Sequence, residues 1–195
     1  LKDMNRVDYL KALIEAGVTS LKVEGRLKDE QYVKNITAFY RQNIDKILND
    51  NPLYEKSGGG ATTFFFTPDP KRTFNRDFTS YFADNQREKI AYFDTPKAMG
   101  QYVGKLRQDR QNRLYYIGDE KLVNGDGLCF INDKGELAGF LVNKVEGQQI
   151  VAQKELSRFS EVDLYRNVDK NYEKQLSEKT ADRKIPVDIT FSELD

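Results

Sequence analysis

The sequence contains no histidine and only one cysteine, Cys129, among its 195 residues. Catalytic systems that pair a serine or cysteine nucleophile with an imidazole, and zinc sites of the HExxH type, are therefore excluded within this chain. One thiol cannot form an intrachain disulfide, and it cannot supply the roughly four ligands that hold a structural zinc or an iron–sulfur cluster. We interpret Cys129 as a small buried side chain and expect no metal site in this chain.

Net charge and long apolar runs are also missing. The 31 Lys and Arg residues are balanced by 31 Asp and Glu residues, so no overall field steers the chain toward nucleic acid or a membrane. No stretch approaches the roughly 18 apolar residues that span a bilayer, and the first residues lack the apolar core of a signal peptide. We therefore expect a cytoplasmic protein without membrane contact. Because the chain begins without methionine, directly in helix-like sequence, we expect a piece of a longer polypeptide.

The first 50 residues show the order helix, strand, helix. Apolar residues recur at helical spacing over 7–14 and end before Gly17, which suits the position after a helix. Residues 18–24 alternate between apolar and polar side chains, which predicts a strand. Asp29 is a suitable N-cap for a helix over 29–49. Short joints between such elements are typical of α/β barrels, so residues 1–50 are predicted to be the C-terminal βα segment of a TIM-like barrel.

Residues 51–86 are predicted to be a linker and connector. The Gly-rich run 57–61 is the most flexible stretch of the chain and indicates a domain boundary. The three phenylalanines at 64–66 are predicted to anchor the connector against a neighbouring domain, and the Pro-containing stretch 67–70 is predicted to be extended.

Residues 87–160 change to short β-prone runs separated by turn signals. Six strands at roughly ten-residue spacing predict a small antiparallel barrel, because a small sheet must close or be covered to hide its edges. The aromatic residues at strand spacing are predicted to be barrel core: Tyr102, Tyr115, Tyr116 and Phe130. The predicted strands are 89–93, 101–107, 114–117, 128–131, 137–145 and 149–153. The fold class is therefore α+β, with this antiparallel β-barrel following the terminal piece of an α/β barrel.

Residues 161–195 are predicted to be a helix and a strand that lead to a further domain. The helix is predicted over 169–179, and the alternating residues Ile185, Val187, Ile189 and Phe191 predict the strand.

Lys22, Glu24 and Arg26 lie at the end of the predicted strand 18–24 and are our candidate catalytic residues. In an α/β barrel, side chains at this end of a strand surround the active site. Glu24 could act as an acid or base, and Arg26 could hold a carboxylate or phosphate with its planar guanidinium. The alternative, an ion pair of Glu24 with Arg26 or Lys22 that stabilises the barrel rim, stays equally open.

A second group of residues is our candidate RNA-binding set: Lys71, Arg72, Phe74 and Arg76. Cations interleaved with aromatic side chains suit phosphate contact and base stacking on single-stranded RNA. The alternative is a solvated connector whose aromatic residues pack in a domain interface. The turn at 124–127 lacks the Lys-Ser/Thr pair of a phosphate loop, so it is predicted to be a β-turn between barrel strands.

Several blocks of the sequence resemble a known family. Residues 16–28 (AGVTSLKVEGRLK), followed by Tyr32-Val33 and Tyr40-Arg41, closely resemble the collagenase-like peptidase U32 family. Within that family, the similarity is to the branch that hydroxylates cytidine in bacterial ribosomal RNA. This narrower likeness rests on residues 29–41, 73–76, 93–97, 124–128 and 165–169.

The resemblance implies a parent enzyme with an α/β barrel whose cysteines, mostly upstream of this region, hold an iron–sulfur cluster. No cofactor is assigned to this chain, which is expected to be inactive alone. The implied partners are the remainder of its own α/β barrel and ribosomal RNA, and the separated chain could form a dimer. Three functions stay open: an accessory region for RNA hydroxylation, a segment of a peptidase, and a non-catalytic interaction module.

Overall fold

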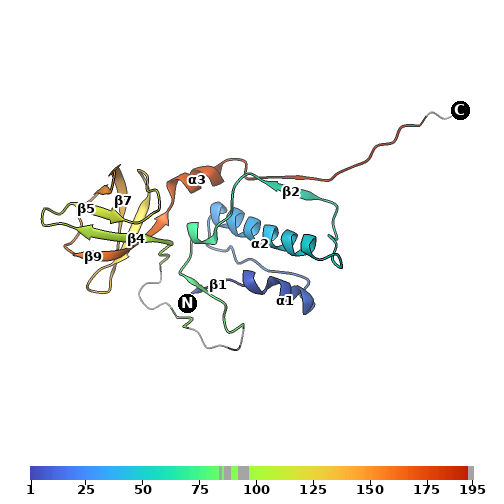
Figure 1. The fold of residues 1–195 in the computed structure, drawn as a ribbon, viewed down its shortest axis with the longest axis horizontal. Coiled ribbons are helices and arrows are strands. Elements are labelled where there is room, and N and C mark those ends of the chain that lie inside the picture. Colours follow the sequence, from blue (N-terminus) through green and yellow to red (C-terminus); the bar gives the residue numbers. More distant parts are fainter. Residues whose placement is uncertain (84, 86–88, 92–96, 193–195) are drawn as a thin grey trace.

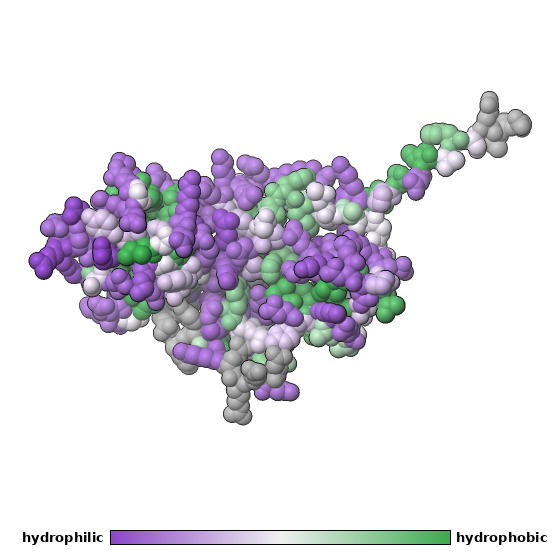
Figure 2. Space-filling view, viewed as in Figure 1, coloured by the Kyte–Doolittle hydropathy of each residue, from purple (hydrophilic) through white to green (hydrophobic). Residues whose placement is uncertain are grey.

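The computed structural model describes residues 1–83, 85, 89–91 and 97–192. A helical part and a β-barrel lie end to end, with α3 (Lys170–Ser177) at the junction between them (Figure 1). Residues 185–192 extend away from the helical part on the side opposite the barrel, and Figure 2 shows apolar residues along this extension. Within the described ranges, no helix is long and apolar enough to cross a membrane.

Both helices predicted in the first 50 residues are confirmed. A 3-10 turn, η1 (Val7–Tyr9), continues into α1 (Leu10–Glu15), and Gly17 follows with a φ of 88°. The positive φ is the left-handed conformation that glycine adopts without steric cost after a helix. The long helix is α2 (Glu30–Asp50), and the Asp29 carboxylate accepts a hydrogen bond of 2.7 Å from the Tyr32 amide as its N-cap.

The strand predicted at 18–24 is wrong. This segment is irregular, and its apolar side chains Val18, Leu21 and Val23 are exposed. A strand requires a neighbour for its backbone hydrogen bonds, and no strand of the described residues pairs with this segment. The terminal piece of an α/β barrel is therefore not shown and stays a prediction.

Two short sheets connect distant parts of the helical region. β1 (Asp3–Met4) pairs in parallel with β3 (Phe78–Thr79), and β2 (Ala61–Phe64) pairs antiparallel with β10 (Ala181–Lys184). The strand predicted at 185–191 is wrong, because pairing ends at Lys184 and the four apolar side chains beyond it are exposed.

The phenylalanine anchor consists mainly of one residue. Phe66 is buried against Ala38 of α2 and against Tyr172 and Leu176 of α3, with Phe64 packed at the edge of this cluster. Phe65 is 52% exposed. The connector then forms a 3-10 turn, η2 (Pro70–Arg72), that is capped by the Asp69 carboxylate.

The predicted antiparallel barrel is confirmed as a closed barrel of six strands in the order β4-β5-β8-β7-β6-β9. Five strands lie where the sequence predicts them, but the range 89–93 is not the sixth. Residues 89–91 are not in a strand, and residues 92 and 93 lie outside the described ranges. The unpredicted strand β9 closes the barrel by pairing with β4 and β6. The strands are β4 (Gln101–Gln108), β5 (Leu114–Ile117), β6 (Gly127–Ile131), β7 (Leu137–Glu146), β8 (Gln149–Ala152) and β9 (Glu161–Val168).

Two of the four aromatic residues predicted to lie in the barrel core are confirmed there. Tyr116 and Phe130 are buried in it, whereas Tyr102 is 52% exposed and Tyr115 is half-buried. The prediction for Tyr102 is wrong because Val103 takes the inward position and the β4–β9 register shifts at Gly104. A bulge of this kind redirects a side chain that simple alternation would place elsewhere.

A cluster of three buried charged residues and one half-buried arginine joins the barrel to the helical part. We call it the charged junction: Arg72, Asp126, Arg166 and Asp169. Asp169 accepts hydrogen bonds of 2.8 and 2.6 Å from the Arg72 guanidinium, lies 3.1 Å from Arg166, and caps α3 through the Tyr172 amide. Asp126 accepts from the Lys170 amide at 2.9 Å, and burial raises its pKa.

We predict that Asp169→Ala lowers the free energy of unfolding by about 3 kcal/mol, because it removes the Arg72 ion pair, one of the ion pairs of the buried Arg166 and the α3 cap. Urea denaturation followed by circular dichroism measures this change. Asp163→Ala, on the exposed face of β9, which ends just before Asp169, is the control and should change stability by less than about 0.5 kcal/mol. Equal losses in the two variants would contradict the prediction.

Candidate nucleic-acid interface

The four predicted RNA-binding residues do not form one surface. Arg72 belongs to the charged junction, and its guanidinium lies 4.2 Å from the centre of the Tyr172 ring. Arg76 forms a 2.8 Å ion pair with Asp3. Both cations therefore hold the connector to other parts of the chain, so their charge is already largely compensated.

Phe74 and Lys71 have different surroundings. The Lys28 ammonium lies 3.0 Å from the centre of the Phe74 ring, so one face of this ring already holds a cation. Burial lowers the pKa of Lys28. Lys71 is exposed, and within the described ranges its ammonium makes no ion pair. Of the predicted set, Lys71 is the residue best placed for an external anion.

Lys71 lies at a hollow of about 410 Å³ where the connector meets the barrel. Asn75 and Asp77 line it from the connector, and Tyr102 and Tyr165 line it from the adjacent strands β4 and β9. Asn75 is held in place by hydrogen bonds from its amide nitrogen to the Lys71 and Thr73 carbonyls, at 2.9 and 3.0 Å. The hollow therefore has a rigid polar wall and an aromatic wall.

The aromatic wall continues over the outside of the barrel. The rings of Tyr102 and Tyr165 lie edge to face, with centroids 5.5 Å apart. Further along β4, Arg107 is opposite Tyr115 of β5, with its guanidinium 6.0 Å from the ring centre. We call Tyr102, Tyr165, Tyr115 and Arg107 the tyrosine strip. Exposed rings beside cations can stack on nucleobases while the cations contact phosphates.

Acidic residues also lie near the tyrosine strip and limit its positive charge. Lys105 of β4 forms a 2.8 Å ion pair with Glu161 of β9. Arg113, the second cation beside Tyr115, is paired with Asp109 at 2.7 Å. The arrangement therefore favours stacking over strong electrostatic attraction.

Tyr165 and Arg107 were not among the residues predicted from the sequence. Their shared feature is an outward position on two paired strands, and it can be recognised only when the pairing is known.

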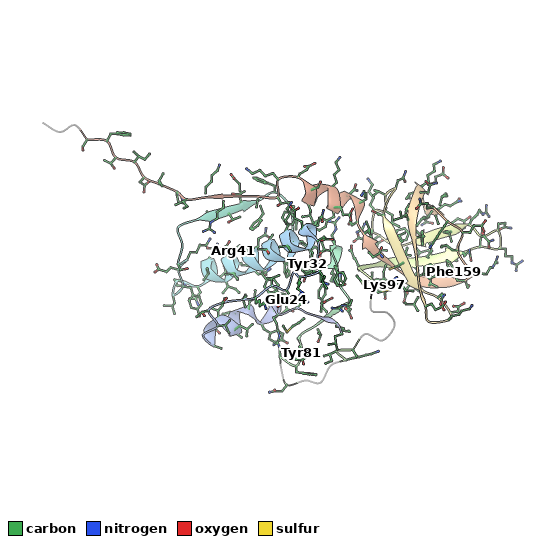
Figure 3. All side chains as sticks on the ribbon, turned by 180° about the vertical axis from the view of Figure 1, so that it is seen from behind. Glu24, Tyr32, Arg41, Tyr81, Lys97 and Phe159 are labelled. Carbon is green, nitrogen blue, oxygen red and sulfur yellow. The ribbon has the colours of Figure 1, made fainter. Side chains whose placement is uncertain are left out.

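The candidate catalytic residues lie apart from this interface. Lys22, Glu24 and Arg26 are exposed on the irregular segment beside α2, and Figure 3 shows Glu24 far from the barrel residue Phe159. Lys22 and Glu24 form a 2.8 Å ion pair, and this hydrogen bond raises the pKa of Lys22. An ion pair was one of our two alternatives, although this one is exposed. A catalytic role for the three residues stays a prediction.

The residues of this chain do not fit an iron–sulfur cluster. Cys129 is fully buried in the barrel, its thiol donates to the Met99 carbonyl at 3.4 Å, and it is the chain's sole cysteine. In the part of the chain that the structure describes, no group of three acidic or cysteine side chains is placed to hold a metal ion. We therefore assign no step to a cluster in this chain.

Comparison with known proteins gives one family match and several relatives. Residues 1–92 match the model of peptidase family U32. The chain is 37% identical, over 97% of its length, to the 23S rRNA 5-hydroxycytidine C2501 synthase of Escherichia coli, and it spans 30% of the length of that relative. No solved structure matches the chain.

Two shorter matches point to different activities. The chain is 39% identical to tRNA hydroxylation protein P1 of Bacillus subtilis over 25% of its own length and 12% of that protein. It is 32% identical to an uncharacterized protease of Methanocaldococcus jannaschii over 47% of its own length and 21% of that protein.

We predict that Cys129 is unreactive in the folded chain. Burial raises the pKa of its thiol to about 12, so near pH 8 the reactive thiolate is about a thousandfold less populated than in an ordinary cysteine. A thiol-reactive dye should label the native protein very slowly and the guanidinium-unfolded protein fully. Rapid labelling in native buffer would contradict this account of Cys129.

Proposed function

Since this chain belongs to peptidase family U32, we propose that it is part of an RNA-hydroxylation protein and that its barrel contacts single-stranded RNA through the tyrosine strip. The similarity to the E. coli rRNA hydroxycytidine synthase supports the proposal because it extends over both the helical part and the barrel. The tyrosine strip and the hollow beside Lys71 also support it, because they present aromatic rings and a cation that an RNA strand could contact.

The observation that carries the RNA contact is the outward position of Tyr102 and Tyr165. This outward aromatic pair is not needed to fill the barrel, because the core is already occupied by aliphatic residues and by Tyr116, Phe130, Phe140 and Phe159. Each nucleobase that stacks on such a ring contributes about 1–3 kcal/mol to binding. The chain has no net charge, so stacking rather than bulk electrostatic attraction would supply most of the affinity.

The proposal leaves the hydroxylation chemistry to other parts of the longer protein. The iron–sulfur cluster implied by the family resemblance requires several cysteines, and this chain has one buried thiol. Lys22, Glu24 and Arg26 are the residues of this chain that we propose for the catalytic region, because they form the block most typical of the family. In this arrangement the barrel holds the RNA and the helical part adjoins the reaction centre.

Peptidase activity is the second candidate function, because of the family's label and the similarity to an uncharacterized protease. The absence of histidine removes the usual imidazole-dependent nucleophiles from this chain. Incubation of the purified chain with casein or gelatin separates the two functions. The RNA proposal expects no cleavage, and cleavage by the chain alone would favour a peptidase.

We predict that Tyr102→Ala weakens binding of a short single-stranded RNA by about tenfold, because one base loses its stacking partner. Tyr102→Phe retains the ring and should bind as the unchanged protein does. Fluorescence anisotropy over a range of salt concentrations measures both variants.

Phe65→Ala is the matched control for this measurement. Phe65 is exposed to the same 52% as Tyr102 but lies on the helical part, next to β2. Its removal should leave RNA binding unchanged. The proposal fails if the unchanged chain shows no RNA binding at low salt, or if the Tyr102 and Phe65 variants lose affinity equally.

A further inference from the structure

A second hollow, of about 380 Å³, lies on the helical part at the end of α2 remote from the barrel. Arg41 of α2 lines one side, and Figure 3 shows it on the half of α2 that is farther from the barrel. Ser57, Gly58 and Gly60 of the Gly-rich loop line the hollow too, and so does Arg183 of β10. We call this the glycine-loop hollow. It shares no lining residue with the hollow beside Lys71.

Positive charge exceeds negative charge around the glycine-loop hollow. Arg41 and Lys56 both bind the same carboxylate, Asp45, with Arg41 Nε at 3.0 Å and the Lys56 ammonium at 2.8 Å. The hydrogen bond from Arg41 lowers the pKa of Asp45, so this carboxylate remains ionised. One carboxylate therefore serves two cations. Glu55 also lines the hollow, but its side chain is exposed.

Arg183 is the third cation, and it has no ion-pair partner within the described ranges. The other two charged residues of β10, Asp182 and Lys184, bind each other, and Asp182 also binds Lys179, which precedes the strand. With Arg41, Lys56 and Arg183 positive and Asp45 and Glu55 negative, the hollow carries a net charge of about +1. A charged guanidinium that faces a polar hollow without a counterion is suited to an external anion.

Because residue 60 is glycine and has no side chain, the Arg183 guanidinium can lie against the loop backbone. A Cβ atom at residue 60 would lie 2.5 Å from Arg183 Nη2 and 2.7 Å from its Cζ. No other residue type can therefore occupy position 60 unless Arg183 moves. Glycines also let backbone amides approach a bound anion closely. The hydroxyls of Thr19 and Ser57 line the same hollow and are further potential donors.

We propose that the glycine-loop hollow binds a phosphate group, with Arg183 as its main ligand and Arg41, Lys56 and the loop amides as further donors. The planar guanidinium of Arg183 matches two phosphate oxygens at once. The phosphate belongs either to an RNA backbone or to a small free phosphate, because the two present the same oxygens to the site. The inference does not depend on the tyrosine strip or on RNA binding by the barrel.

Titration of the full chain with inorganic phosphate, followed by NMR of the backbone amides, tests the proposal directly. The amides of residues 58–60 should shift in a saturable way at constant ionic strength. Arg183→Gln should weaken this binding by about tenfold or more, since it removes a charge-assisted contact. Gly60→Ala should weaken it too, because its methyl group displaces the guanidinium.

Lys184→Gln is the matched control. It removes one positive charge from the adjacent residue of β10, whose ammonium binds Asp182 at 3.2 Å. Phosphate binding should stay within about twofold of that of the unchanged chain, as expected for a charge outside the site. Absence of saturable shifts in the unchanged chain, or equal weakening by Arg183→Gln and Lys184→Gln, would overturn the proposal.

A parallel titration with short single-stranded RNA identifies the source of the phosphate. If Arg183→Gln weakens RNA binding as well as phosphate binding, the hollow holds a backbone phosphate. If only inorganic phosphate is affected, the ligand is a free phosphate compound, and the site still stands. Dependence of RNA binding on Tyr102 is measured independently, so failure of this site and failure of the barrel interface give different results.

Discussion

The charged junction is the interaction on which the relative position of the two parts depends. Removing Arg166, Asp169 and Asp126 from water is costly unless each charge keeps its partners. Arg72, which lies on the connector, also binds Asp169. All of these charges keep their partners only when the barrel, α3 and η2 are packed together. The same packing places Lys71, the neighbour of Arg72 in the sequence, near the start of β4. The hollow beside the tyrosine strip is therefore a direct geometric result of how the buried charges are satisfied.

The sequence predicts strands well where their partners are close in the chain. β5 lies at the predicted positions, and β6, β7 and β8 lie within one residue of them, because turns bring their alternating faces together within a few residues. Alternation fails at 18–24 and at 185–191, where the described residues provide no pairing partner. β10, by contrast, is the polar stretch Ala181–Lys184, and it is held by backbone pairing with the distant β2. Backbone pairing of this kind does not require alternating apolar residues, so no apolar pattern in the sequence reveals it.

The sequence predicts which residue types occur in the candidate site, but not which individual residues are available to bind a ligand. The composition of the connector correctly indicated cations mixed with aromatic residues. Arg72 and Arg76, however, are compensated by Asp169 and Asp3, which lie 97 and 73 positions away in the chain. No local pattern reveals such long-range pairs. The outward position of Tyr102 could not be predicted either. The bulge at Gly104 shifts the alternation of inward and outward side chains along β4.

The closing strand of the barrel has a consequence for how the two parts are joined. The start of β4 and the end of β9 are paired at Gln101 and Arg166, so the chain enters and leaves the barrel at neighbouring points. The helix that follows, α3, returns to α2, where Tyr172 donates a hydrogen bond to Asn35. The barrel is thus topologically an insertion within the helical part, a module with adjacent ends that could be exchanged between proteins without breaking the surrounding fold.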